Sequence, residues 1–432
     1  MVTIIGPEQI GRSSGKTVAE LLSEQAGIIV NGAGSNPGKD KSLFFRGAGS
    51  QYTVILLDGI VANDPSGSGG VFDLRLIPID QIERIEILKG GQSTLYGSDA
   101  VAGVINIVTK KEGKPGNNVF GSATAGNYDT YRGTIGLSST ADRITYNLNL
   151  SHSRTGGISE AALPPAGSTV PFDKDGFRQT AFNGNFSIRL DDSGKVRVSP
   201  FIRYFTEKGG FDDGSFADAK NEFLGKSFHI GGNAIYALKN GRFNFNYSHQ
   251  NNEREYQTAF PATYNGLTNL LDFYYTQSIG EHVQILGGID NRYTFIKIKD
   301  TQLPDNSANQ FAAYASVVLN KLSIFNLELG GRYNKHNRYG ENYTYTVNPF
   351  LTFLNDDLKV FGTVSTSFKA PDLIALFGPF GANADLKPER SNSYEAGFQS
   401  YFIDKKLSFR AVGYQRKIND AIVYVGRGYL NQ

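Results

Sequence analysis

LFFRGAGSQYTVILLDGIVANDPSGSGGVFDLRLIPIDQIERIEILKGGQSTLYGSDAVAGVINIVTK occupies residues Leu43–Lys110 of the chain. Three short apolar runs, Thr53–Leu57, Ile82–Leu88 and Val104–Val108, lie in this stretch and are separated by glycine-rich turns. This arrangement predicts short strands joined by tight turns in a compact α/β unit. After Gly113 the pattern changes to a long succession of alternating strands. The sequence therefore predicts two bodies of different kinds.

Composition and charge narrow the class of protein. The chain has 432 residues, enough for two domains, and its 43 Lys and Arg against 41 Asp and Glu leave a net charge of +2. No basic run of five residues occurs, so nothing supports a nucleic-acid partner. Cysteine is absent, which excludes disulfides and thiolate metal sites. The first residues lack the pattern of a signal peptide, so the signal of an exported protein would have been removed or not included.

Residues after Gly113 alternate between polar and apolar side chains with period two. The alternation is clear in Arg143–Ser151 and Arg242–Ser248, and Tyr343–Phe353 sustains it for eleven residues. Asn and other hydrogen-bonding residues form one face, and Phe, Tyr and Leu form the other. Strands of soluble sheets average ~5–6 residues, whereas a tilted membrane strand needs ~9–11. The pattern predicts an antiparallel, up-and-down membrane β-barrel, although no apolar run approaches the ~18 residues of a spanning helix.

The connections between these strands alternate in length. About 16 strands are expected from the periodicity. Short polar turns alternate with long polar connections, which is typical of outer-membrane barrels with their long loops outside. The long connections are predicted at about 154–180, 207–225, 252–268, 335–342 and 369–392.

Motifs along most of the chain resemble one known family. They are Phe45–Gly47, Val54–Gly59, Ile82–Gly90, Leu95–Ser98 and Ala102–Ile107, followed by Ser367–Leu373, Asp385–Ser391 and Tyr394–Gly397. In order and spacing the first set resembles the plug domain of TonB-dependent outer-membrane receptors and transporters, and the second set resembles their barrel motifs. The resemblance implies an N-terminal α+β plug domain at residues 1–113, inside the lumen of a transmembrane β-barrel at residues 114–432.

The ends of the chain depart from the family pattern. The family barrel has about 22 strands, and its members usually end on an aromatic residue, whereas this chain ends on Gln432. A barrel that stops within its sheet would leave unpaired backbone groups facing lipid. A barrel incomplete at its C-terminus is therefore expected, the alternative being a smaller barrel that closes on itself. The segment that binds TonB, which normally precedes the plug, is not recognisable.

The resemblance also implies a function. It implies TonB-dependent active uptake of a scarce, bulky nutrient across the outer membrane of a Gram-negative cell, by a monomeric, multi-pass barrel in contact with lipid. TonB and its inner-membrane motor complex would be the energy-coupling partner. The chain looks most similar to the cobalamin receptors of the family, so cobalamin or a related corrinoid is the first expected ligand and a ferric siderophore the alternative. A colicin or phage receptor role would use the same loops, and the sequence does not separate it.

No catalytic constellation supports an enzyme. Gly11–Gly15 formally matches a G-x-S-x-G nucleophile elbow, but a helical pattern rather than a strand precedes it. The five histidines are scattered without metal-ligand spacing. No covalent cofactor and no catalytic residue are expected.

Candidate site residues fall into three groups. Plug apices predicted to contact ligand are Asn63, Asp64, Ser66, Phe72 and Tyr96. Charged residues predicted to pair within the plug or with the barrel wall are Arg46, Glu83, Arg84 and Glu86, for which a solvated strand face is the alternative. Clustered carboxylates beside glycine turns can supply oxygen ligands to calcium, and those expected in the outer loops are Asp173, Asp175, Asp212, Asp213 and Asp218, with solvated turn acids as the alternative.

Overall fold

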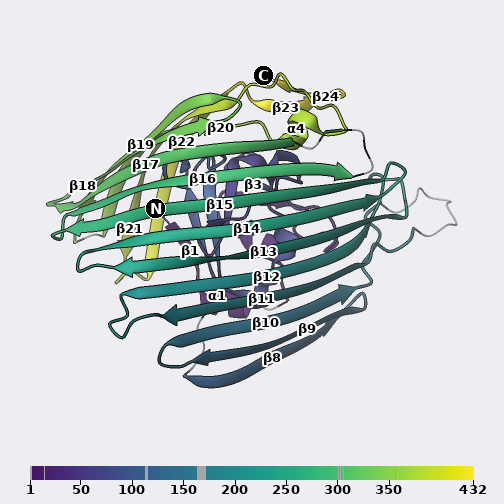
Figure 1. Ribbon diagram of the computed structural model, residues 1–432, viewed down its shortest axis with the longest axis horizontal. Coiled ribbons are helices and arrows are strands. Elements are labelled where there is room, and N and C mark those ends of the chain that lie inside the picture. The colour runs from purple at the N-terminus through teal and green to yellow at the C-terminus, as the bar shows by residue number, and fades with distance from the viewer. Residues whose placement is uncertain are drawn as a thin grey trace.

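The computed structural model describes residues 2–13, 15–111, 115–162, 172–299, 301, 303–304, 306–355 and 357–432. An N-terminal plug lies inside the curve of one very large antiparallel sheet (Figure 1). The predicted domain boundary at residue 113 lies outside the described residues.

The plug is built on a mixed sheet of five strands in the order β1-β6-β7-β4-β5. Their bounds are β1 Val2–Ile5, β4 Thr53–Leu57, β5 Ile60–Val61, β6 Ile82–Lys89 and β7 Gly103–Thr109. Strand β4 pairs with β7 in parallel, and β6 pairs with β7 in antiparallel fashion. The three apolar runs of the sequence thus form the three central strands.

Short helices and a second small sheet complete the plug. They are α1 Pro7–Arg12, α2 Val18–Ser23, β2 Ile28–Asn31, β3 Ser42–Phe45, α3 Ser93–Tyr96 and the 3-10 turns η1 Ser50–Tyr52, η2 Ser68–Gly70, η3 Leu74–Leu76 and η4 Ile79–Gln81. A capping box starts α2, because Thr17 Oγ1 accepts from the backbone N–H of Glu20 and the Glu20 carboxylate accepts from that of Thr17. None of the described helices is long and apolar enough to cross a membrane.

Close packing in the plug core leaves no room for a side chain at Gly103. A Cβ there would lie 2.1 Å from Phe45 Cε1 and 2.6 Å from the carbonyl oxygen of Leu88. Glycine therefore lets the ring of Phe45 lie directly against strand β7, in a core that joins α2 to the central sheet.

Fifteen consecutive antiparallel strands form the large sheet, from β8 at one edge to β22 at the other. They are β8 Gly116–Gly126, β9 Thr130–Thr140, β10 Ile144–Thr155, β11 Phe177–Arg189, β12 Val196–Phe211, β13 Asn221–Ala237, β14 Gly241–Gln257, β15 Ala262–Ile279, β16 Val283–Lys299, β17 Asn306–Leu322, β18 Phe325–His336, β19 Gly340–Phe353, β20 Leu358–Lys369, β21 Glu389–Phe402 and β22 Leu407–Asn419. The fold is the expected plugged, barrel-like sheet, with close to the expected number of strands.

The strands are longer, and the outer connections shorter, than the sequence predicted. Strand β15 has 18 residues, whereas ~9–11 suffice to cross a bilayer. The connection expected at 252–268 is confined to residues 258–261, because β14 and β15 extend through most of it. Beyond their apolar band the strands continue with polar residues on both faces. Because such a segment does not alternate, its sequence predicts a loop although its backbone is a strand.

The remaining elements lie at the end of the barrel that carries the long connections. Helix α4 spans Leu373–Phe377, and β23 Ile422–Val425 pairs with β24 Gly428–Asn431 in a hairpin beside it (Figure 1). Buried Leu376 and Leu386 pack against the hairpin residues Ile422 and Tyr429.

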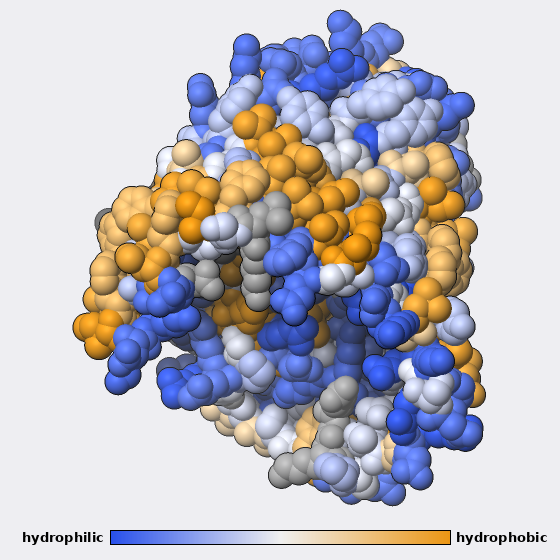
Figure 2. Space-filling model, turned by 90° about the vertical axis from the view of Figure 1, so that its left-hand side faces the viewer, coloured by the Kyte–Doolittle hydropathy of each residue, from blue (hydrophilic) through white to orange (hydrophobic). Residues whose placement is uncertain are grey.

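The two faces of the large sheet have opposite polarity to those of a soluble sheet. Asn149 is 1% exposed on the face toward the plug, while the adjacent Leu150 is 46% exposed on the other face. Figure 2 views the barrel from the end with the short turns, and hydrophilic residues surround a hollow there while hydrophobic residues gather toward the flanks. A polar interior and an apolar exterior are those of a membrane barrel.

Candidate functional site

Ion pairs join the plug to five strands of the barrel wall. All of them are wholly or largely buried, and their wall partners come from β12, β14, β16, β20 and β21. The pairs are Arg46–Glu395 at 2.7 Å, Asp58–Arg203, Asp64–Arg254 at 2.8 Å, Asp73–Arg254 at 3.7 Å, Arg75–Glu207 at 3.7 Å, Asp99–Arg292 at 3.4 Å and Asp99–Lys369 at 3.0 Å.

The turn after β4 presents Asp58 to the wall. Asp58 has a φ of 56°, a left-handed conformation that Asp tolerates in tight turns. Its carboxylate accepts from the backbone N–H and the hydroxyl of Thr109 and pairs with Arg203, which is 2% exposed on its side chain. Arg203 also stacks over the ring of Phe201 at 4.1 Å. This turn is fixed to β12 by a desolvated ion pair.

A second cluster centres on Arg75 of the plug. Its guanidinium contacts Asp73 at 2.6 Å and Asp40 at 2.7 Å, and it lies 4.3 Å over the ring of Phe223. Burial alone would raise the pKa of Asp73, but the charges of Arg75 and Arg254 outweigh it and hold that pKa well below its usual value. The carboxylate therefore stays ionised between two cations.

Asp99 bridges two distant parts of the wall. It has a φ of 81° and binds Lys369 at the top of β20 and Arg292 on β16. These two cations lower the pKa of Asp99 against the opposing effect of burial. Lys369 Nζ also donates to the carbonyl of Gly69 at 3.4 Å, so one wall lysine contacts two plug apices.

Of the four plug residues predicted to form charge pairs, Arg46 pairs with the barrel wall and the other three pair with one another. Arg46 binds Glu395 on β21 and lies 4.9 Å over the ring of Tyr414 on the wall. Arg84 stays within the plug, where it pairs with Glu83 at 3.0 Å and Glu86 at 2.7 Å. Sequence reasoning missed the pairing of Asp58, Asp73, Arg75 and Asp99 with the wall. Asp58 and Lys369 lie in family motifs, but no motif or spacing connects a plug residue to its wall partner.

The five predicted ligand contacts occupy four environments. Ser66 and Phe72 line a large cavity at the outer end, and Asn63 lines a smaller one beside Asp99. Asp64 is buried and accepts from Ser66 and Arg254. Tyr96 packs beside the apolar cluster around Val54 and Val104 and lies apart from the outer cavity.

The large cavity measures about 750 Å³ and lies between the plug apices, β14–β15, the loop carrying α4, and the β23–β24 hairpin. Its position at the long-loop end of the barrel makes it the candidate ligand site. Aromatic residues contribute much of the lining, namely Phe72, Tyr256, Tyr264, Phe380, Tyr424 and Tyr429.

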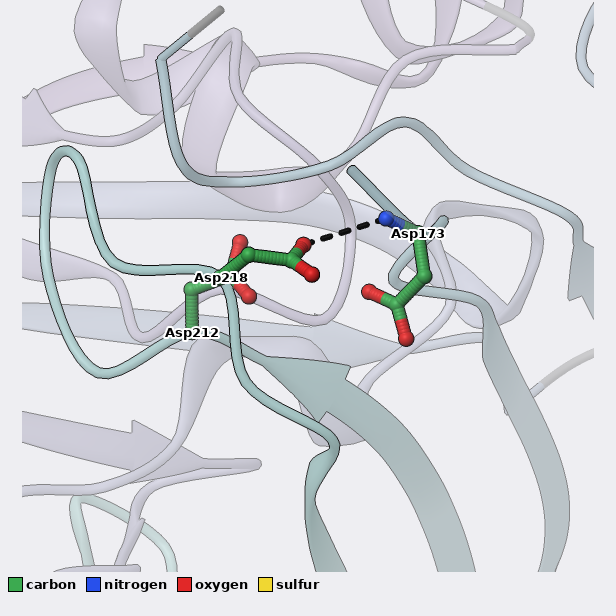
Figure 3. Close-up of side chains that lie close together, drawn as sticks. All are labelled: Asp173, Asp212 and Asp218. Atoms are coloured by element: carbon green, nitrogen blue, oxygen red, sulfur yellow. Dashed lines mark hydrogen bonds between the residues drawn. The ribbon is translucent and has the colours of Figure 1, made fainter. Parts of the chain in front are cut away.

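Three of the five predicted calcium ligands come together in the outer loops (Figure 3). Carboxylate oxygens of Asp173, Asp212 and Asp218 all lie within 4.8 Å of one another. Asp218 also accepts from the backbone N–H of Asp173 at 3.0 Å. Asp173 Oδ1 is buried without a hydrogen-bond partner among the described residues, so the cluster has an oxygen available for a cation.

The other two acids are held differently. Asp213 accepts from Asn221 at 2.7 Å, outside the three-carboxylate group. Asp175 is buried, and its carboxylate accepts a hydrogen bond from the backbone N–H of Glu160 at 2.7 Å. Burial and the nearby Asp212 carboxylate raise the pKa of Asp175 to about 7, although the Glu160 hydrogen bond opposes the shift.

Comparison with known proteins places these features in a family context. Residues 1–104 match the TonB-dependent Receptor Plug Domain, and residues 95–432 match the TonB dependent receptor-like β-barrel. The siderophore receptor PirA from Acinetobacter baumannii has a TM-score of 0.81 at 18% identity, over 100% of this chain and 76% of that chain. PirA from Pseudomonas aeruginosa has a TM-score of 0.79 at 17% identity, over 100% of this chain and 79% of that chain. A mutant of the ferric enterobactin receptor PfeA from Pseudomonas aeruginosa, in complex with enterobactin, has a TM-score of 0.76 at 18% identity, over 98% of this chain and 72% of that chain. At these identities the likeness concerns the fold.

Replacing Arg203 with Gln tests the buried pairing of the plug. Arg203→Gln leaves the buried Asp58 carboxylate with the half-exposed Lys111, at 3.1 Å, as its remaining cationic partner. It should therefore lower the stability of the docked plug, by up to about 3 kcal/mol. Hydrogen exchange of the β4 and β7 amides, measured on the protein in detergent, reports this loss. Arg143→Gln is the matched control, because its pair with Asp192 is exposed and should contribute less than about 1 kcal/mol. Equal exchange in the two variants would contradict the assignment.

The raised pKa of Asp175 predicts a pH dependence of the outer loops. The folded state holds its proton more tightly than the unfolded state, so this group stabilises the fold most at low pH. That contribution should fall as pH rises from about 4 to about 7. Thermal unfolding of the wild type and of Asp175→Asn across this pH range isolates the effect. Only the wild type should lose stability through this carboxyl, because the amide of the variant does not titrate. Parallel pH profiles would show that the carboxyl does not titrate there.

Proposed function

The chain belongs to the TonB-dependent receptor family, whose members are outer-membrane β-barrel proteins, and on that basis we propose that it takes up a ferric siderophore. The ligand would bind at the outer face of a Gram-negative cell and enter through the lumen with energy supplied by TonB. The solved structures that the fold resembles include siderophore receptors. This favours a siderophore over cobalamin, which the sequence had placed first.

The outer cavity is the observation that carries the proposal. It combines a volume suited to a bulky ligand with aromatic side chains from the plug, the wall and the outer loops. Ligand sites of this size are usually lined by aromatic and apolar groups with a few polar ones. The plug closes the lumen below this cavity, so passage requires the plug to move.

Contacts at the floor of the cavity suggest how binding is coupled to the plug. Arg254 and Lys369 line the cavity and also bind the plug residues Asp64, Asp73 and Asp99. A ligand whose oxygens accept hydrogen bonds from these two side chains would weaken their attachment to the plug apices. TonB would then complete the movement by breaking the remaining pairs, such as Asp58–Arg203.

A calcium ion in the outer loops is part of the same proposal. The cluster of Asp173, Asp212 and Asp218 comes from two loops, so a bound ion would cross-link them beside the entrance. The three carboxylates supply the hard oxygen donors that calcium prefers, and one of their oxygens, Asp173 Oδ1, has no hydrogen-bond partner among the described residues.

Loss of one exposed aromatic ring tests the ligand site. Phe380 lines the cavity and is 56% exposed, whereas Phe216 is 75% exposed on an outer loop away from the cavity. Phe380→Ala should weaken binding of a ferric siderophore about tenfold, the loss of one aromatic contact. Equilibrium binding of iron-55-labelled siderophores to the protein in detergent measures it. Phe216→Ala is the control and should bind as the wild type does. Tight binding of cyanocobalamin, with no binding of siderophores, would overturn the proposal.

Calcium removal tests the proposed metal site. Calcium at 100 times its dissociation constant should stabilise the folded loops by about 2.7 kcal/mol. Limited proteolysis of the outer loops with calcium and with a chelator measures this protection. Asp212→Asn combined with Asp218→Asn should abolish it, and Asp191→Asn combined with Asp192→Asn, on a short turn at the opposite end, should not. Identical proteolysis with and without calcium would remove the metal from the proposal.

A further inference from the structure

The charges that line the outer cavity are nearly balanced, with carboxylates in excess. Three basic side chains, Lys41, Arg254 and Lys369, face the cavity among the described residues. Four acidic ones, Asp40, Asp73, Asp372 and Glu389, line it too. Asp40 and Asp73 pair with Arg75 and Arg254, whereas Asp372 and Glu389 have no ion pair among the described residues. An anionic ligand would therefore meet two carboxylates that no cation pairs with.

The three cations are already bound to other groups. Arg254 pairs with Asp64 and Asp73, and Lys369 pairs with Asp99. Lys41 donates to the carbonyl oxygens of Gly32 and Asn36. Burial and the neighbouring Arg75 lower the pKa of Lys41 to about 8. Arg254 and Lys369 hold the plug to the wall, and Lys41 is bound within the plug, so the three cations leave little positive potential for a ligand.

One carboxylate oxygen at the cavity remains unsatisfied. Glu389 is 2% exposed, and its Oε1 accepts from the hydroxyl of Tyr52 and the backbone N–H of Ile422. Its Oε2 has no hydrogen-bond partner among the described residues. This oxygen is itself buried beneath the cavity lining, where its carboxylate repels an anion in the cavity.

The residue that caps α4, Asp372, is a second acidic group in the lining of the cavity. Asp372 Oδ1 accepts from the backbone N–H groups of Ile374 and Ala375 at 3.0 Å each, so this carboxylate is held in position by the helix. Burial raises the pKa of Asp372 despite these bonds, which is expected for an acid in a site poor in free cations.

We infer that the cavity selects an uncharged ferric chelate of the trihydroxamate type over an anionic one of the tricatecholate type. This inference rests on the proposed siderophore function and specifies its substrate class. Iron(III) bound by three singly charged hydroxamates forms a neutral chelate, while three doubly charged catecholates leave three negative charges. Desolvating that charge beside Glu389, without a free cation, is unfavourable.

The aromatic lining is complementary to a neutral chelate. Tyr256, Tyr264 and Tyr429 present rings with hydroxyl groups to the same space. Such side chains pack against the organic shell of a ligand and donate hydrogen bonds to its carbonyl oxygens.

Direct comparison of two ferric chelates tests the inference. Equilibrium binding to the full chain in detergent is measured with ferrichrome, a neutral trihydroxamate complex, and with ferric enterobactin, a tricatecholate complex. Ferrichrome should bind at least about tenfold more tightly, which corresponds to about 1.4 kcal/mol. Ferric enterobactin binding as tightly or more tightly would overturn the inference and leave the siderophore function standing. Failure of both chelates to bind correctly folded protein would overturn the proposed function and the inference with it.

A charge variant locates the origin of the preference. Glu389→Gln keeps the acceptor for Tyr52 and Ile422 and removes the negative charge. It should narrow the difference between the two chelates about tenfold, mainly by tighter binding of ferric enterobactin. Glu281→Gln, on the short turn between β15 and β16, removes an exposed carboxylate at the other end of the barrel and should leave the preference unchanged. An unchanged preference in Glu389→Gln would show that the cavity charge does not set it.

Discussion

A charge that is taken out of water needs a partner, and this requirement governs how the plug sits in the barrel. The apolar side chains of each strand face lipid, and the polar side chains that alternate with them face the plug. A plug with an ordinary apolar surface would leave that wall unsatisfied. The plug instead presents Asp58, Asp64 and Asp99 to wall cations, and Arg46 to a wall carboxylate. Complementary charge thus joins the two bodies, alongside apolar contacts such as those of Ile60 with Phe201 and Leu270.

Local pattern predicted the elements well, and distant partners poorly. The runs at Thr53–Leu57 and Ile82–Leu88 became β4 and β6, because apolar runs between glycine turns have few other solutions. The period of two along the rest of the chain gave the two faces of the wall. Lys369 meets Asp99 across 270 positions of sequence, and no spacing rule connects them. Strand ends were also misplaced, since polar residues beyond the bilayer look the same whether they lie in strand or in loop.

The candidate site was predicted in outline rather than in detail. Ser66 and Phe72 line the outer cavity, so their contact with ligand stays a prediction, whereas Tyr96 lies elsewhere and Asp64 is held by Arg254. Asp173, Asp212 and Asp218 come together because two loops fold toward each other, whereas Asp175 and Asp213 turn to other partners. Whether acids in separate loops converge depends on how the strands beneath them are staggered, which the sequence of each loop does not contain.

The length of the central strands has a consequence for how such a receptor can diversify. Strand β15 exceeds the membrane requirement by about eight residues, enough to carry the sheet about 20 Å beyond the bilayer. Above the lipid it forms a stiff collar whose hydrogen bonds are closed within the ladder. Loops on that collar can change in sequence, length or charge without disturbing the insertion of the barrel into the membrane or the contacts between plug and wall. One scaffold can then acquire new cargo by mutation at its rim, while its membrane and energy-coupling parts stay under separate constraint.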